Sequence, residues 1–242
     1  MRILDYIKVP YTTIPRMEKY EGPLLHSNPS KEYLREKQKE LYFQGENIWF
    51  QSDLAYHHRL VSKACNVLGL ERETEITKLG LKIQEDIVIV HRGRLEAAFV
   101  AFPSGWKPGD KQALTLEELH RPVADGEVLR KHSGRLADLM CKDICYHRGV
   151  WTLTTSKYLS AYPDYVPPEA ECEDDLWFRS EHQISFPIEE GITSGFLIDV
   201  YLTPFWILPA NIKQKIKCSI NSMSESVLSY KRLNKIKELL GL

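Results

Sequence analysis

The feature that most constrains the fold is a pair of apolar segments separated by one short turn. Residues 81–90 and 95–102 are rich in β-branched and aromatic side chains, and Arg92-Gly93-Arg94 lies between them. Two such runs joined by a short connection that contains glycine are typical of a β-hairpin. The chain is therefore expected to contain an antiparallel sheet.

The remaining segments divide between helices and strands. Ser30 is placed to cap a helix over residues 31–43, and Thr115 with Glu118 has the spacing of a capping box at the start of a short helix that ends at His120-Arg121-Pro122. Apolar periodicity predicts further helices over 53–68, 128–146 and from Ser224 onward, and further strands over 150–155, 176–187 and 195–202. This order predicts the α+β class, with helices packed on one side of an antiparallel sheet.

Length and composition fit one domain behind an N-terminal arm. The chain has 242 residues, of which 43% are hydrophobic and 27% charged, which suffices to bury a core. Residues 1–30 contain four prolines and are expected to form an extended arm on the surface, and residues 31–242 to form a single domain. No apolar run reaches the ~20 residues of a membrane span, and the start lacks the apolar core of a secretion signal. We therefore expect a cytoplasmic protein that does not enter a membrane.

Charge and motifs argue against several functions. The net charge is -1, so the sequence offers no surplus of positive charge for binding a nucleic acid. It contains no glycine-rich nucleotide-binding motif and no Gly-x-Ser-x-Gly elbow. None of the five cysteines forms Cys-x-x-Cys, so neither an iron–sulfur cluster nor a zinc knuckle is expected.

Two patches could carry chemistry, each with a plain structural alternative. Gln84-Glu85-Asp86-Ile87 places two acids at the start of a strand, which the solvated end of that strand would also explain. His120 ends a short helix two residues before Pro122, and this ending can aim an imidazole into a cavity. The alternative for His120 is a helix-end histidine whose charge matches the helix dipole.

A third patch lies on the predicted strand over residues 176–187. Arg179 and Glu181 share one face of that strand, because side chains alternate with a period of two. On a central strand these charges must pair or point into a polar cavity, since an isolated buried charge is costly. The alternative is an exposed Arg179–Glu181 pair on a sheet with one solvated face.

Taken in order, these patches resemble the heme-dependent oxidative N-demethylase alpha-subunit family. The matching segments are Ile83-Gln84-Glu85-Asp86-Ile87, Phe102-Pro103-Ser104-Gly105-Trp106 through Lys111, Leu119-His120-Arg121-Pro122-Val123, Arg179-Ser180-Glu181-His182-Gln183, and Ser222-Met223 through Tyr230-Lys231.

The resemblance implies a PAS-like fold in which an antiparallel sheet and flanking helices enclose a heme b. It also implies oxygen-dependent removal of a methyl group from a small secondary or tertiary amine. Carried over to this sequence, His120 becomes the axial iron ligand, and Trp106 and Lys111 become cofactor-binding residues. Glu181 becomes the pocket acid near iron and amine, and Arg179 a partner of a heme propionate or of the polar pocket.

A monooxygenase of this kind needs electrons, and the sequence has no flavin, nicotinamide or iron–sulfur motif. We therefore expect a separate flavin or iron–sulfur reductase subunit in trans. The alternative is a non-enzymatic PAS-like protein that binds heme or another small ligand as a sensor. Trp151-Thr152-Leu153-Thr154-Thr155 carries neither the arginine nor the asparagine that the family has on this strand, which favours the sensor. Retention of His120, Arg179 and Glu181 together favours the enzyme.

Overall fold

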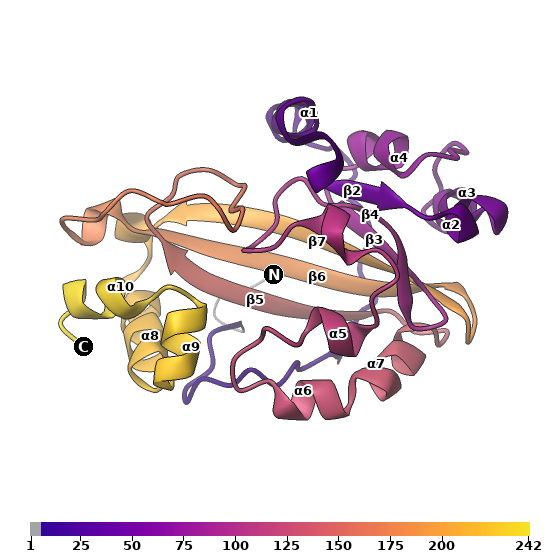
Figure 1. Ribbon diagram of the computed structural model, residues 1–242. Coiled ribbons are helices and arrows are strands. Elements are labelled where there is room, and N and C mark those ends of the chain that lie inside the picture. The colour runs from indigo at the N-terminus through magenta and orange to yellow at the C-terminus, as the bar shows by residue number, and fades with distance from the viewer. Residues whose placement is uncertain (1–5) are drawn as a thin grey trace.

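An antiparallel sheet organises the computed structural model, which describes residues 6–242 (Figure 1). Over these residues the sheet has seven strands in the order β1-β5-β6-β7-β3-β4-β2, and every neighbouring pair is antiparallel. The strands are β1 Glu18–Lys19, β2 Trp49–Gln51, β3 Asp86–His91, β4 Arg94–Phe99, β5 Tyr146–Thr154, β6 Trp177–Glu189 and β7 Thr193–Pro204. The predicted α+β class with an antiparallel sheet is confirmed.

Helices lie on both faces of this sheet, so the expectation that they would pack on one side is wrong. In Figure 1, α1–α4 lie above the sheet and α5–α7 below it, and α8–α10 gather at one end of the long strands. The helices are α1 Lys31–Gln44, α2 Asp53–His57, α3 Leu60–Val67, α4 Ile76–Lys82, α5 Leu116–Leu119, α6 Glu127–Lys131, α7 Ser133–Met140, α8 Ala210–Asn221, α9 Glu225–Tyr230 and α10 Asn234–Leu239. None of them is long and apolar enough to cross a bilayer, within the described part of the chain.

The predicted hairpin is present as β3 and β4. Its turn holds Arg92 at φ 50° and Gly93 at φ 75°, the left-handed backbone that tight hairpin turns require. The first strand begins at Asp86, not at Leu81, because residues 81 and 82 close helix α4. Successive residues of β3 face opposite sides of the sheet, so one strand contributes to two cores.

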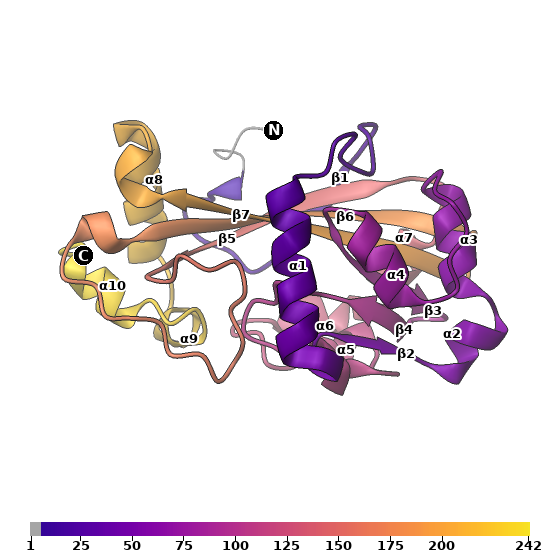
Figure 2. The same cartoon turned by 90° about the horizontal axis from the view of Figure 1, so that it is seen from above.

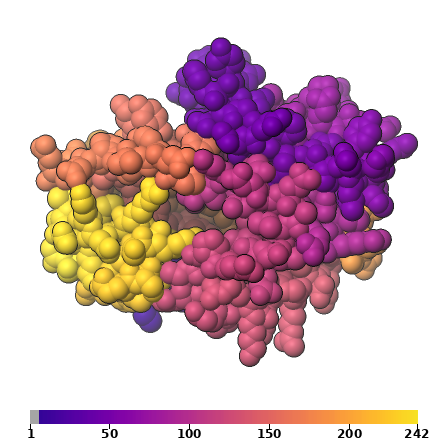
Figure 3. Space-filling model, viewed as in Figure 1, coloured from indigo at the N-terminus to yellow at the C-terminus, as the bar shows by residue number. Residues whose placement is uncertain are grey.

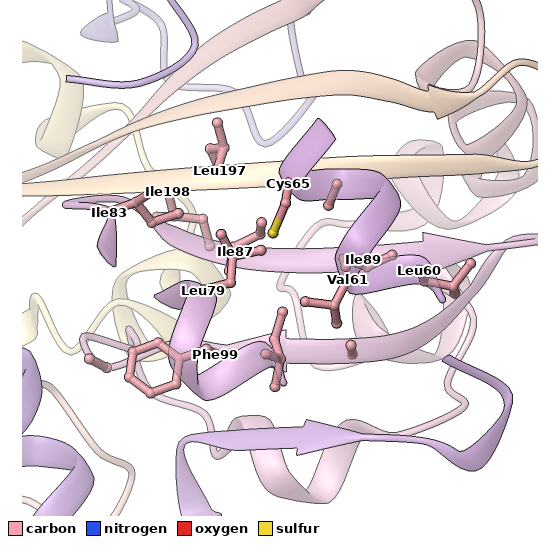
Figure 4. Packing of buried hydrophobic residues seen from close by; sticks show 14 of the residues in the cluster. Leu60, Val61, Cys65, Leu79, Ile83, Ile87, Ile89, Phe99, Leu197 and Ile198 are labelled. Atoms are coloured by element: carbon pink, nitrogen blue, oxygen red, sulfur yellow. The ribbon is translucent and has the colours of Figure 1, made fainter. Parts of the chain in front are cut away.

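The first of these cores lies under α2–α4. Leu79 of α4 and Cys65 of α3 pack over Ile87 and Ile89 of β3 (Figure 4). The neighbouring residues Val88 and Val90 belong to a second cluster, which includes side chains of α5 and α7. Both faces of the hairpin are therefore buried, which explains its continuous apolar sequence.

Helix boundaries follow local capping signals where such signals exist. Ser30 accepts a hydrogen bond from the Tyr33 amide at 3.3 Å and starts α1 as predicted. The helix predicted over 53–68 is divided into α2 and α3, because Arg59 adopts a left-handed conformation with φ 55°. The predicted C-terminal helix is likewise divided into α9 and α10 at Arg232, which has φ 56°, and α8 was not predicted.

The largest correction concerns the helix predicted over residues 128–146. Its first part forms α6 and α7, but Tyr146 opens β5 and pairs with Ser185 of β6. The strand therefore begins four residues earlier than expected and includes Arg148. Its hydrogen-bond partners lie almost forty residues away in the sequence, and no local pattern announces that pairing.

The N-terminal arm is held against the sheet and the C-terminal helices, and its strand β1 forms the sheet edge next to β5. Within its described part, residues 6–30, the only strand is β1, which pairs with Tyr146 and His147; residues 1–5 lie outside the described chain. The Tyr11 amide donates to Ser222 Oγ at 2.9 Å, and His26 Nε2 lies 2.6 Å from Asp199 Oδ2. Figure 2 shows the arm beneath and beside the sheet before it enters α1. The arm is thus held by contacts distant in sequence.

Acidification is expected to weaken the fold at His182. Burial of this imidazole, together with neighbouring His147, lowers its pKa to about 4 from 6.5. Between these two values the unfolded chain binds a proton that the folded chain does not, so the free energy of unfolding falls as pH drops from 6.5 to about 4. The loss is on the order of 1–2 kcal/mol after allowance for partial exposure of the ring.

Urea denaturation at several pH values measures this dependence. His182→Gln should flatten the curve between pH 6.5 and about 4, whereas His132→Gln, at an exposed position, should leave it unchanged. An unaltered curve in His182→Gln would assign the pH dependence to other groups.

Candidate functional site

A cavity of about 700 Å³ opens on the sheet face that carries Glu181 and Gln183. Figure 3 shows the surface hollowed between the C-terminal helices in yellow, the orange loop before β6 and the magenta segment after β4. Arm residues 11–18 form part of the wall. Apolar side chains from the sheet and from the region of α5–α7 form another part: Val88, Val90, Leu95, Leu116, Leu119, Leu129, Leu136, Met140, Phe196 and Ile198. This volume and lining are typical of a site for a small molecule or cofactor.

His120 lines the cavity from the end of α5. The predicted capping box is present, since Thr115 Oγ1 accepts from the Glu118 amide at 3.2 Å and the Thr115 amide donates to Glu118 Oε2 at 2.8 Å. One turn later, Nδ1 of His120 donates to the Leu116 carbonyl oxygen at 2.6 Å. The cap and this hydrogen bond fix the helix end and the orientation of the imidazole.

The protonation state of His120 suits a ligand role. Burial lowers the pKa of His120, the Leu116 hydrogen bond opposes that effect, and the charge of Arg148 lowers the pKa further. The ring is therefore neutral at pH 7. With Nδ1 as donor, Nε2 carries the lone pair, and it has no hydrogen-bond partner among the described residues. A neutral imidazole oriented through its other nitrogen is the usual form of a metal-ligating histidine.

A chain of polar side chains crosses the cavity floor from β5 to β6. Arg148 Nε donates to Gln183 Oε1 at 2.6 Å, and Gln183 Nε2 donates to Glu181 Oε2 at 2.7 Å. The other carboxylate oxygen, Oε1, accepts from Ser104 Oγ. Arg179 Nε donates to the same Ser104 Oγ at 2.9 Å. The alternation of β6 and the pairing of Arg148 opposite Gln183 bring these groups together, and they hold Glu181 between two arginines.

Arg179 is buried, not part of an exposed pair. Only 3% of the residue is accessible, and its terminal nitrogens donate to the carbonyl oxygens of Phe102, at 2.9 Å, and Leu159. Burial lowers the pKa of Arg179, and the charge of Glu181 opposes this effect. Both side chains form a hydrogen bond with Ser104 Oγ and do not pair directly, so the alternative of a surface Arg179–Glu181 pair is wrong.

Lys231 is a further cation of the cavity that the sequence pattern did not single out for a role. Its Nζ donates to the Trp151 carbonyl oxygen at 2.7 Å and lies 5.5 Å from the centre of the Tyr11 ring. Burial lowers the pKa of Lys231 to about 8, while the charge of Glu181 acts in the opposite direction. Lys231 belongs to a segment that matched the family pattern, which was the only signal available in the sequence.

The predicted site residues converge on this one place. Trp106, Lys111, His120 and Glu181 line the cavity, and Arg179 lies behind the lining with its hydrogen bonds directed to protein atoms. Three segments remote in sequence, around Trp106, His120 and Glu181, therefore meet at this cavity.

Two expectations about neighbouring residues are corrected. The strand after α7 was expected to lack an arginine, but β5 begins at Tyr146 and carries Arg148 into the cavity. The acids Glu85 and Asp86 were expected at a solvated strand end, but they are 3% and 0% exposed. Asp86 lies 3.2 Å from the fully buried Nζ of Lys37, so this patch is a structural ion pair under α1.

Comparison with known proteins identifies one family. Residues 41–240 match the family model described as haem-dependent oxidative N-demethylase, alpha subunit-like. The match covers the sheet from β2 onward and every segment that contributes to the cavity except the arm. No curated protein matches the sequence.

Proposed function

Because the chain belongs to the haem-dependent oxidative N-demethylase, alpha subunit-like family, we propose that it is a heme-binding oxidoreductase subunit with a PAS-like fold. The reaction is oxygen-dependent removal of a methyl group from a small secondary or tertiary amine. The observation that carries this proposal is His120, a neutral imidazole held through Nδ1, with Nε2 left as a ligand in a cavity of about 700 Å³.

The residues around the cavity fit a heme b. Nε2 of His120 would ligate the iron, and the apolar wall from the sheet and the α5–α7 region suits a flat macrocycle. Trp106 offers an aromatic surface, and Lys111 an ammonium group for a propionate. Arg179 contributes indirectly in this arrangement, because it positions Ser104 and through it Glu181.

When bound, heme supplies the chemistry by which O2, together with two electrons, oxidises the amine. One N-methylamine, one O2, two electrons and two protons give the demethylated amine, formaldehyde and water. Glu181 binds the ammonium form of the substrate, or accepts its proton at a carboxylate oxygen so that the free amine can be oxidised. Gln183 and Ser104 orient that carboxylate, and the arm residues exclude water from one side of the cavity.

The sensor alternative rested on residues 151–155 lacking both the arginine and the asparagine that the family has on this strand. Strand β5 supplies an arginine to the cavity at Arg148 but contains no asparagine, so half of that argument is removed. We therefore favour the enzyme.

Turnover is expected to require electrons from a separate flavin or iron–sulfur reductase. The heme-loaded chain, incubated with O2 and either dimethylamine or trimethylamine, should release no sustained formaldehyde until a reductase and its electron donor are added. Formaldehyde assays with and without the reductase test this directly. Sustained release without any electron source would contradict the proposed function.

Glu181→Gln is expected to slow amine oxidation by about 10- to 100-fold, because a hydrogen bond to a charged group contributes about 1.5–3 kcal/mol. The amide keeps the shape of the side chain but loses the negative charge. Heme content should remain close to that of the unaltered protein. Glu190→Gln, at an exposed position, is the matched control and should leave the rate unchanged. An equal rate in both variants would remove Glu181 from the reaction.

A further inference from the structure

The polar end of the cavity holds more positive than negative charge. Arg148, Lys231 and Glu181 line it, and Arg179 lies directly behind. Neither Arg148 nor Lys231 lies within ion-pair distance of a carboxylate, among residues 6–242. Glu181 therefore faces three cations, and it already accepts hydrogen bonds from Ser104 and Gln183.

Arg148 and Lys231 both have N–H groups that donate no hydrogen bond to a described residue. Arg148 uses Nε for Gln183, and its two terminal nitrogens donate to no described residue. Lys231 uses one of its three protons for the Trp151 carbonyl oxygen. Cations removed from bulk water without a counter-charge are costly, so an anionic ligand group at this place would be strongly favoured.

We propose that Arg148 and Lys231 form a subsite for a carboxylate group. A guanidinium with two free nitrogens matches the two oxygens of a carboxylate, and the lysine adds a point charge. The carboxylate has two sources: an N-methylated amino acid, whose ammonium group binds Glu181, or a propionate of heme. The first source rests on the proposed function and makes the substrate a zwitterion.

The zwitterion matches the site better than a simple alkylammonium does. Glu181 and Arg148 are joined through Gln183 alone, so the binding groups for an ammonium and for a carboxylate lie side by side. An alkylammonium without a carboxylate would meet Arg148 and Lys231 uncompensated, and like charges repel more strongly in a partly enclosed site than in bulk water. Substrates that carry both charges are therefore preferred.

Calorimetric titration of the heme-free and the heme-loaded protein tests the first source. The ligands are N,N-dimethylglycine and N,N-dimethylisobutylamine, in which an isopropyl group replaces the carboxylate. N,N-dimethylglycine should bind about 10- to 100-fold more tightly, as expected for hydrogen bonds to charged groups. Arg148→Gln and Lys231→Gln should each remove about tenfold of that preference, and Lys142→Gln, at an exposed position, none.

Titration with hemin and with its dimethyl ester tests the second source. If a propionate occupies the subsite, the unaltered protein prefers hemin to the ester, and Arg148→Gln and Lys231→Gln abolish that preference. If the unaltered protein prefers either N,N-dimethylglycine or hemin to its analogue, and the variants lose that preference, the result supports the carboxylate subsite and identifies its source. The inference would be overturned if the unaltered protein bound N,N-dimethylglycine no more tightly than N,N-dimethylisobutylamine and hemin no more tightly than its dimethyl ester. This comparison uses only the unaltered protein, so it does not depend on whether a variant folds. Failure to bind any heme would count against the proposed function alone, because the amino-acid titration of the heme-free protein is independent of it.

Discussion

Arg179→Ala is expected to lower the free energy of unfolding by about 3–5 kcal/mol, the usual range for removing one partner of a buried charged network. The guanidinium is 3% exposed and donates to Ser104 Oγ and to the carbonyl oxygens of Phe102 and Leu159. The substitution leaves these carbonyl groups without the donor they have in the folded protein and also leaves a cavity. Urea denaturation followed by circular dichroism measures the loss.

The matched control is Arg135→Ala, which removes an exposed arginine from α7. That variant should stay within about 0.5 kcal/mol of the unaltered protein. Arg179→Met restores most of the lost volume without the charge, so it should recover part of the stability. A change of less than about 1 kcal/mol in Arg179→Ala would indicate an exposed pair and contradict the buried network that joins Arg179 to Glu181 through Ser104.

His120→Ala is expected to weaken heme binding by at least about 100-fold, since loss of an outer-shell partner alone costs about 10- to 100-fold and loss of the ligand costs more. The side chain is at the end of α5, and its exchange for alanine disturbs neither the capping box nor the sheet. Added imidazole should restore part of the heme affinity by occupying the vacated position. Heme transfer to apomyoglobin measures the dissociation of heme from each variant.

His132→Ala provides the control, because His132 is exposed and lies outside the cavity lining. It should retain heme as well as the unaltered protein does. If His120→Ala also retained it, the ligand would have to be sought elsewhere, first at His147, which lines the same cavity.

Local signals in the sequence predicted the parts of the fold that local interactions determine. The hairpin follows from Gly93 between two apolar runs, and the starts of α1 and α5 follow from the Ser30 and Thr115 caps. Pairing partners far along the chain decide the rest. Tyr146 has the spacing of the preceding helix but lies in a strand because Ser185 of β6 pairs with it.

The same distinction applies to the site. Alternation along a strand is a local property and placed Arg179 and Glu181 on one face, whereas the roles of Glu181 and His120 in a cofactor pocket came from the family resemblance. Arg148 was not predicted as a site residue, because the expected helix over residues 128–146 and the expected strand over 150–155 left it outside both elements, whereas it lies in β5. The arm as a cavity wall was also beyond prediction, because its anchor, the hydrogen bond from Tyr11 to Ser222, spans 211 positions.

The absorption spectrum of the purified protein during titration with hemin tests the central claim most directly. If the cavity binds heme through His120, a Soret band shifted from that of free hemin should grow and saturate at one heme per chain. The same titration of His120→Ala should give a weaker and displaced band. A spectrum that follows free hemin throughout, with no saturation, would contradict heme binding by this cavity.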